Sequence, residues 1–232
     1  MKIINSPKSN LTNDRQTGID AAFHDLIVMI DSDHRLLQGD IESLINDLEE
    51  YDLDIVQSCL ISYKNNGFWE SAEESSWNVS HNIPGPKNMI GTAPAIYRKK
   101  IFKKIKFNSN ITSTIDDTDF IYRLKNNNDF KIGIGKTQIR QYHYSNFKTF
   151  LTKFMWYGKG DIEFCFKNPK RSLSMLVHLL IRYPLFYSFK AVLQTQYKAI
   201  PFFILQGFVR FFGMVYFFKS TYTKARTYYE SA

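Results

Sequence analysis

The run Leu26-Ile27-Val28-Met29-Ile30-Asp31-Ser32-Asp33-His34 decides the fold, because five apolar residues in a row end abruptly in two carboxylates. A continuous apolar run of this length is typical of a strand that is covered on both faces, as in parallel sheets. Ligands of open α/β sheets bind beyond the carboxyl ends of the strands. Carboxylate oxygens there suit a hard cation such as Mg²⁺ or Mn²⁺, which in turn suits a diphosphate. Asp31 and Asp33 therefore predict a metal site, with a solvated turn or helix cap as the alternative.

The segments around this run alternate between helix and strand patterns. Small and polar residues over 13–22 predict a helix before the first strand. Apolar residues then recur at helical spacing between 40 and 50, with Asp40 placed to cap the start. The apolar stretch 54–61 predicts another strand. This alternation is typical of an α/β fold in which a mixed, mostly parallel sheet is flanked by helices.

The basic residues of the chain are concentrated toward its C-terminal end. The 232 residues carry a net charge of +8, and residues 150–232 hold twelve Lys or Arg against three acids. A basic surplus among aromatic residues suits either nucleic acid or an anionic membrane face. The cations lie among long apolar segments, so we expect a membrane surface and no nucleic-acid partner.

The cysteines and the first residues bear on the compartment. Cys59 and Cys165 are widely spaced and show no metal-ligand pattern, which predicts a reduced, cytoplasmic chain. Residues 1–25 are polar and resemble no secretory signal. We therefore expect the folded part of the chain to stay in the cytoplasm.

Two apolar, aromatic-rich segments follow Pro169, at 173–192 and 199–218. The second is long enough to cross a bilayer but contains Arg210, and an arginine at the centre of a span costs on the order of 2.5–3.5 kcal/mol on insertion scales. We therefore expect an interfacial or re-entrant tail. A true span and helices packed on a soluble domain are the alternatives.

A second group of carboxylates, Asp116, Asp117 and Asp119, precedes an apolar helical pattern. One interpretation is a well-capped helix. However, three carboxylates in four positions repel one another more than a cap requires, and a helix N-terminus keeps an exposed carboxylate ionised. An ionised carboxylate there could act as a general base. Spacing alone leaves both interpretations open.

Three further positions have both a structural and a functional interpretation. Residues 65–87 lack periodicity and predict a long loop in which Trp77 either binds an acceptor or packs on the surface. His143 lies between two tyrosines, as either a packed residue or a ligand. Lys159 lies between two glycines, in either an ordinary turn or a flexible segment that approaches a phosphate.

Taken in order, four motifs resemble those of the family-2 glycosyltransferases, which have a glycosyltransferase A-type nucleotide-sugar-binding fold. They are Asp14-Arg15-Gln16-Thr17-Gly18-Ile19 for the family's Ala-Arg-Asn-x-Gly-Ile, Ile30-Asp31-Ser32-Asp33 for its Asp-x-Asp, Gly91-Thr92-Ala93 with Tyr97-Arg98 for its acceptor-side strand, and Asp116-Asp117-Thr118-Asp119-Phe120 for its Glu-Asp-x-Asp. The resemblance implies a catalytic domain over 1–168 and a basic, aromatic-rich, membrane-associating helical tail over 169–232.

The resemblance also implies roles on the donor side. A divalent ion, Mg²⁺ or Mn²⁺, would bridge the donor's diphosphate and neutralise the leaving group. Its ligands would be Asp31, Asp33 and His143. Arg15 and Lys159 would contact the nucleotide or its phosphates, together with Asp31.

On the acceptor side, Asp117 matches the family's catalytic base. It would deprotonate an acceptor hydroxyl that attacks the anomeric carbon directly and inverts its configuration. Asp116, Asp119 and Trp77 would line the acceptor site or support it.

These roles imply an inverting glycosyltransferase, of hexosyltransferase type, that moves a sugar from a UDP- or GDP-linked donor to a hydroxyl of a glycan or lipid-linked acceptor. Bacterial relatives of this kind build surface polysaccharides, so we expect the chain at the cytoplasmic face of the inner membrane, peripheral or with one C-terminal span. The resemblance begins at what would be the family's third strand, so we expect the opening strand, helix and strand to be absent. The main alternative is therefore a catalytically incomplete glycosyltransferase-like fragment that acts as a membrane-associated binding or assembly partner. A metal-dependent phosphohydrolase is a weaker alternative, because the sequence shows no evident nucleophile.

Overall fold

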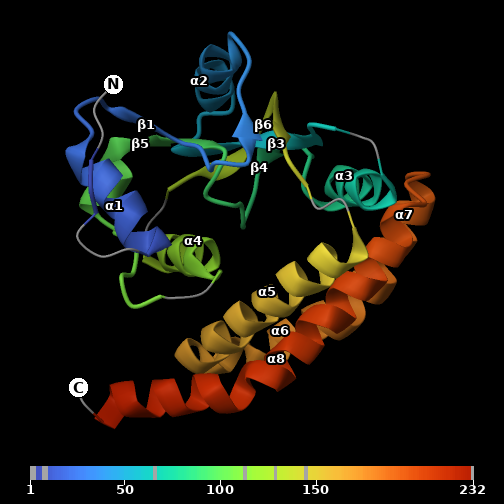
Figure 1. Ribbon diagram of the computed structural model, residues 1–232. Coiled ribbons are helices and arrows are strands. Elements are labelled where there is room, and N and C mark those ends of the chain that lie inside the picture. Colours follow the sequence, from blue (N-terminus) through green and yellow to red (C-terminus); the bar gives the residue numbers. More distant parts are fainter. Residues whose placement is uncertain are drawn as a thin grey trace. The chain divides into compact units, whose positions relative to one another are not determined.

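The computed structural model describes residues 4–6, 10–64, 67–111, 114–127, 130–143 and 146–230. The chain divides into two compact units. The first comprises residues 1–63, 82–112 and 116–142, and the second comprises 64–81, 113–115 and 143–232. Figure 1 shows the elements of both units along the chain. The predicted functional division into 1–168 and 169–232 stays a prediction.

The first unit is a mixed sheet flanked by helices. Its strands are β1 (Leu26–Met29), β2 (His34–Arg35), β3 (Ile55–Ser62), β4 (Gly85–Pro86), β5 (Ala95–Arg98) and β6 (Ile132–Gln141). Its helices are α1 (Leu11–Ala21), α2 (Asp40–Glu50), the 3₁₀ segment η1 (Lys99–Lys103) and α4 (Asp116–Asn127). The strand order is β1-β5-β3-β6-β2, and β4 pairs with β6.

The predicted α/β class and mixed sheet are confirmed, but the expectation of a mostly parallel sheet is wrong for the described strands. Only β3 and β6 pair in parallel among them, and the β1–β5, β3–β5, β2–β6 and β4–β6 pairs are antiparallel. An apolar run records burial on two faces and carries no information on strand direction. The burial itself is as expected, because Ile27 and Met29 join one apolar cluster while Leu26 and Val28 pack against another.

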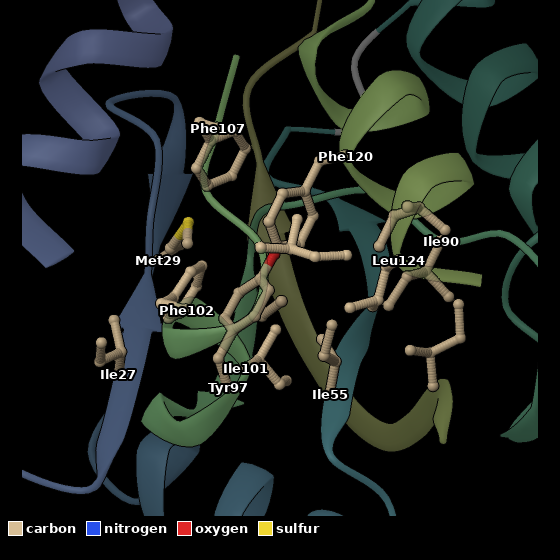
Figure 2. Close-up of a cluster of buried hydrophobic side chains, with 14 of the residues drawn as sticks. Ile27, Met29, Ile55, Ile90, Tyr97, Ile101, Phe102, Phe107, Phe120 and Leu124 are labelled. Carbon is tan, nitrogen blue, oxygen red and sulfur yellow. The ribbon is translucent and has the colours of Figure 1, made fainter. Parts of the chain in front are cut away.

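The larger cluster of the first unit holds α4 against the sheet (Figure 2). Phe120 of α4 stacks on Phe107 with ring centroids 4.5 Å apart, and both side chains are buried. Tyr97 of β5 is fully buried in the same cluster, and its hydroxyl donates to the Thr92 carbonyl at 2.7 Å. A buried tyrosine whose hydroxyl is hydrogen-bonded keeps its ring in one orientation, and the neighbouring side chains pack against that ring. The cluster thereby positions the start of α4 and the loop before β5.

The predicted helix over 40–50 is confirmed as α2, although its cap differs from the expectation. Gly39 is the N-cap residue and has a φ of 88°, a conformation that favours glycine. Asp40 is the first helical residue, and its carboxylate accepts a hydrogen bond from the Leu37 amide at 2.7 Å. Leu44 and Leu48 are fully buried and join the second apolar cluster, as their spacing predicts.

The second unit is helical in its described residues. It consists of α3 (Phe68–Ser80), α5 (Phe147–Lys167), the 3₁₀ turn η2 (Pro169–Arg171), α6 (Ser172–Val177), the π-helical segment η3 (His178–Tyr187), α7 (Ser188–Leu193) and α8 (Ala199–Glu230). The loop expected over 65–87 is wrong where α3 lies, and residues 65 and 66 are outside the described residues. The buried side of α3 includes Glu70, Glu73 and Ser76, so its hydrophobic periodicity is weak.

The helix α5 continues through the Gly158-Lys159-Gly160 stretch, so both interpretations of this stretch, an ordinary turn and a flexible segment, are wrong. Gly158, together with Gly213 of α8, allows close packing of α5 on α8. A Cβ at Gly158 would lie 2.2 Å from the Arg210 carbonyl oxygen, and one at Gly213 would lie 2.5 Å from the Met155 carbonyl oxygen. Only residues without a Cβ let the two backbones approach this closely.

A buried ion pair joins the same two helices. Arg210 of α8 donates through Nε to Asp161 Oδ2 at 2.8 Å and through a terminal nitrogen to Asp161 Oδ1 at 2.5 Å. It also donates to the Tyr183 hydroxyl at 3.2 Å. The Asp161 side chain is 2% exposed. The arginine that the sequence marks as costly in an apolar helix is therefore paired inside the second unit.

We predict that Asp161→Asn destabilises the second unit by about 3 kcal/mol, because it leaves the Arg210 charge buried without a counter-charge. All three tryptophans of the chain, Trp69, Trp77 and Trp156, lie in this unit, so tryptophan fluorescence during urea unfolding reports on it. The control is Glu163→Gln on the same helix, which removes an i,i+4 pair to Lys167 and should cost below about 0.5 kcal/mol. Equal shifts in the two variants would contradict the prediction.

Candidate active site

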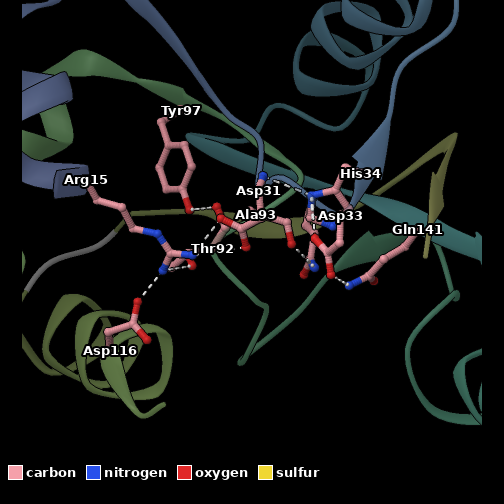
Figure 3. Close-up of polar contacts among 10 residues, drawn as sticks. Arg15, Asp31, Asp33, His34, Thr92, Ala93, Tyr97, Asp116 and Gln141 are labelled. Atoms are coloured by element: carbon pink, nitrogen blue, oxygen red, sulfur yellow. Dashed lines mark hydrogen bonds and ion pairs between the residues drawn. The ribbon is translucent and has the colours of Figure 1, made fainter. Parts of the chain in front are cut away.

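Polar side chains gather beyond the C-terminal end of β1, in the first unit (Figure 3). Asp31 and Asp33 lie in the turn between β1 and β2. The Asp31 amide donates to Nδ1 of His34 at 3.0 Å, and the Tyr142 amide donates to the Asp33 carbonyl at 2.8 Å. Because β2 pairs with β6, the turn is held between two strand ends.

Arg15 of α1 connects this turn to two other segments. Its guanidinium donates to Asp31 Oδ1 at 3.0 Å and Oδ2 at 3.2 Å, and to the Thr92 hydroxyl at 2.8 Å. It also forms an ion pair with Asp116, the first residue of α4. The Arg15 side chain is 12% exposed and that of Asp116 is 5% exposed. One side chain thus ties α1, the turn after β1, the loop before β5 and the start of α4 together.

The arrangement concentrates negative charge around a single cation. Burial raises the pKa of Asp116, and the Arg15 guanidinium opposes that rise. Where both carboxylates are ionised, Arg15 neutralises only one charge of the two. The excess attracts a further cation to the more open carboxylate, Asp31, whose side chain is 42% exposed.

The donor set beside Arg15 fits a divalent cation. Asp31, Asp33 and His34 each offer one ligand atom, and these atoms lie within 4.8 Å of one another. The Asp33 side chain is 38% exposed, and its Oδ2 accepts from Gln141 Nε2 at 2.7 Å, which orients the carboxylate. Two carboxylates with one imidazole suit ions such as Mn²⁺ or Mg²⁺. Sequence reasoning assigned no role to His34, although it follows Asp33 directly, because a single histidine beside an acid is weak evidence for a ligand.

Asp117 follows Asp116 at the start of α4. Burial, with the negative charge of Asp116 as the second cause, raises the pKa of Asp117 to about 6. The sequence predicted the opposite direction for the pKa, because an exposed carboxylate at a helix N-terminus would stay ionised. Asp117 Oδ1 accepts from the Thr118 amide at 2.6 Å, which fixes the carboxylate in direction. A positioned carboxylate with a pKa near neutrality is suited to accept a proton.

Asp119 has a different partner from its two acidic neighbours. Its Oδ2 accepts from Arg123 Nε at 2.8 Å, one turn further along α4, and its side chain is 7% exposed. Arg123 also donates to the Lys106 carbonyl at 3.0 Å. The pair anchors α4 to the segment after η1, and the predicted acceptor-side role of Asp119 stays a prediction.

The remaining predicted residues belong to the second unit. His143 Nδ1 lies 2.7 Å from Glu73 Oε2, and the Trp77 ring lies 4.6 Å from the His143 ring, centroid to centroid. Lys159 Nζ lies 5.9 Å from the centroid of the Phe217 ring. The predicted metal role of His143, diphosphate role of Lys159 and acceptor role of Trp77 stay predictions.

A comparison with known families agrees with the motifs of the sequence. A family model described as "Glycosyl transferase family 2" matches residues 1–159. A search of solved structures finds the crystal structure of S. aureus TarS 1–349, with a TM-score of 0.44 and 15% sequence identity. The match covers 85% of this chain and 60% of that chain. A search of curated proteins finds no match.

We predict that Asp33→Ala weakens Mn²⁺ binding about tenfold or more, because it removes one of two carboxylate ligands. Titration of the purified chain with Mn²⁺, followed by electron paramagnetic resonance of the free ion, measures the affinity. The matched control is Asp25→Ala, which removes an exposed carboxylate from the opposite end of β1 and should leave binding unchanged. Equal affinity in both variants would refute the assignment.

Proposed function

The chain belongs to glycosyl transferase family 2, and from this premise we propose that it is an inverting enzyme that moves a sugar from a nucleotide-diphosphate donor to an acceptor hydroxyl. One observation carries the proposal. A single guanidinium, Arg15, contacts Asp31 of the candidate metal group and Asp116, the neighbour of the candidate base Asp117. Groups for the leaving diphosphate and for the attacking hydroxyl thus meet in one unit.

On the donor side, Asp31, Asp33 and His34 would hold the divalent cation, with His143 as a further proposed ligand. When bound, the cation supplies positive charge that stabilises the departing diphosphate. Arg15 adds a second positive charge beside Asp31. We propose that Lys159 provides a further contact to the diphosphate.

On the acceptor side, Asp117 takes the proton of the acceptor hydroxyl. The hydroxyl oxygen then forms a bond to the anomeric carbon while the bond from that carbon to the diphosphate oxygen breaks. Direct displacement at one carbon inverts its configuration. Burial and the charge of Asp116 keep the pKa of Asp117 near 6, so that the carboxylate is ionised at neutral pH and still accepts a proton.

The substrates and the location are proposed at a coarser level. We propose a UDP- or GDP-linked sugar as donor and a glycan or lipid-linked hydroxyl as acceptor, with Trp77, Asp116 and Asp119 on the acceptor side or supporting it. The product would belong to a cell-surface polysaccharide. Two helical stretches, Pro169–Leu193 and Ala199–Thr223, are long and apolar enough by composition to cross a membrane. We propose that the chain acts at the cytoplasmic face of the inner membrane through residues 169–232.

We predict that Asp117→Asn lowers the turnover number about 10²- to 10⁴-fold, because the amide cannot accept the proton of the acceptor. Donor binding, measured by titration with nucleotide sugar and Mn²⁺, should stay within about twofold of the wild type, because the donor site is intact. Asp25→Asn is the matched control, since it removes an exposed carboxylate that has no proposed role in the site. It should leave turnover unchanged.

A panel of nucleotide sugars with Mn²⁺ distinguishes the enzyme from the binding partner. Sugar transfer that depends on Asp117 supports the proposed reaction. Metal-dependent nucleotide binding without transfer would favour a catalytically incomplete member that acts as a binding or assembly partner. Hydrolysis of the nucleotide without any need for an acceptor would favour a phosphohydrolase.

We predict that kcat/KM rises with pH through an apparent pKa of about 6 and then levels off. The sign follows from the mechanism, because the protonated carboxyl below that pH cannot accept the acceptor's proton. Metal affinity in general falls at low pH because protons compete for the ligand atoms, so Mn²⁺ affinity is measured over the same range. A rise that follows metal occupancy alone, or that persists in Asp117→Asn, would contradict the assignment.

A further inference from the structure

One face of α8 presents apolar side chains to solvent. Its members are 41% to 73% exposed, and their spacing of four, three, one and six residues keeps them on one side of a helix. They are Phe208, Phe212, Val215, Tyr216 and Tyr222. The other side of α8 is packed inside the second unit through Phe202, Phe203, Val209 and Met214. The helix therefore has a packed side and an open apolar side.

The segment from α6 to α7 repeats this arrangement. Its exposed apolar residues recur every four positions and are 37% to 73% exposed. They are Leu173, Val177, Ile181, Leu185, Phe189 and Leu193. A step of four suits this segment because its middle part, η3, is π-helical and has a wider turn than an α-helix. Together with the exposed residues of α8, these side chains are called the apolar face below.

The charged residues that lie among these apolar residues in the sequence are all basic, and of them Arg210 is paired with Asp161. The sequence contains no Asp or Glu between Glu163 and Glu230. The same stretch contains Lys167, Lys170, Arg171, Arg182, Lys190, Lys198, Arg210, Lys219, Lys224 and Arg226. Apolar and aromatic side chains with a basic surround complement the headgroup layer of an anionic phospholipid bilayer. An uncharged or basic surface would leave these basic residues without a counter-charge.

The packing of α8 favours a position in the membrane plane over a span. The close approach at Gly158 and Gly213 and the Asp161–Arg210 pair bind one side of α8 to α5. Only the other side is available to lipid. In addition, Arg182 is exposed in the middle of the first candidate span, where a bilayer centre would strand its charge. At the interface the same side chain reaches the headgroups.

We propose that the apolar face inserts into the interfacial layer of an anionic phospholipid bilayer, with α6, η3, α7 and α8 lying in the membrane plane and none of them crossing it. The Asp161–Arg210 pair makes this possible, since it turns the arginine of α8 away from the lipid. The inference extends the membrane association proposed above to a defined surface and lipid class. It is tested without donor or acceptor, so its failure is separate from failure of the sugar transfer.

Sedimentation of the full chain with phosphatidylcholine vesicles, with and without phosphatidylglycerol, measures binding. Phe212→Ser with Tyr216→Ser should weaken binding about tenfold or more, because two inserted aromatic rings are lost. The matched control is Phe23→Ser, which removes an 84% exposed aromatic side chain from the first unit and should change nothing. An equal effect of both, or no vesicle binding by the wild type, overturns the proposal.

A second pair of variants tests the lipid charge. Lys198→Glu with Lys219→Glu should weaken binding to the phosphatidylglycerol vesicles about tenfold or more, because each lysine near an anionic surface contributes measurably. Lys103→Glu with Lys104→Glu is the control, since both lysines are exposed in the first unit. Binding that is as tight to pure phosphatidylcholine as to the anionic vesicles would overturn the choice of lipid.

Depth measurements separate the in-plane position from a span. Cys59 and Cys165 are buried, so a fluorophore attached to introduced cysteines reports from the chosen positions. Phe189→Cys, Phe212→Cys and Tyr222→Cys should all be quenched by lipids that carry a nitroxide near the headgroup and little by lipids that carry it near the bilayer centre. Strong quenching of any position from the bilayer centre overturns the proposal. Vesicle binding without sugar transfer would support this inference and contradict the proposed reaction.

Discussion

The guanidinium of Arg15 is the interaction on which the first unit's site depends. It lies between Asp31, which follows β1, and Asp116, which begins α4, and these residues are far apart in the sequence. Without that charge, Asp116 would be a buried carboxylate without its cation, and Asp31 would repel it. The apolar cluster around Tyr97 and Phe120 brings the backbone segments together, and Arg15 makes their acidic ends compatible. The same contact leaves one carboxylate's charge in excess, which is the electrostatic condition for holding a cation.

A second buried arginine solves a similar problem in the other unit. Arg210 lies on a helix whose composition is that of a membrane segment, yet Asp161 and Tyr183 accept its hydrogen bonds inside the protein. Three hydrogen bonds from Arg210 within the protein offset part of the cost of burying the pair. The consequence is geometric, because the side of α8 that carries Arg210 faces α5 and the exposed apolar side faces outward. In α8, Arg210 thus lies on the packed side of the helix.

Much of this could be predicted from the sequence, and the parts that could not have identifiable physical reasons. The helix over 40–50, the buried strand at Leu26 and the acidic positions of the site follow from local periodicity and from motifs. Strand direction does not, because an apolar run has the same composition in either direction. Helix α3 was missed because its buried side contains the polar residues Glu70, Glu73 and Ser76. The buried positions therefore do not appear as a hydrophobic pattern in the sequence. The bridging role of Arg15 and the raised pKa of Asp117 depend on residues that meet only in the folded chain.

The chain therefore contains two buried pairs of an arginine and an aspartate, and the sequence alone does not distinguish their roles. In the first unit, the buried side chains of Arg15 and Asp116 lie beside Asp31. The side chains of Asp31 and Asp33 remain more than a third exposed and can exchange partners. In the second unit, the Asp161 side chain is 2% exposed and is paired with Arg210. Exposure, and not the presence of a charged pair, decides which of the two can do chemistry. The site that we propose for a cation and a diphosphate needs carboxylates that are held in place and still open to solvent, and the contact of Arg15 with Asp31 meets that condition.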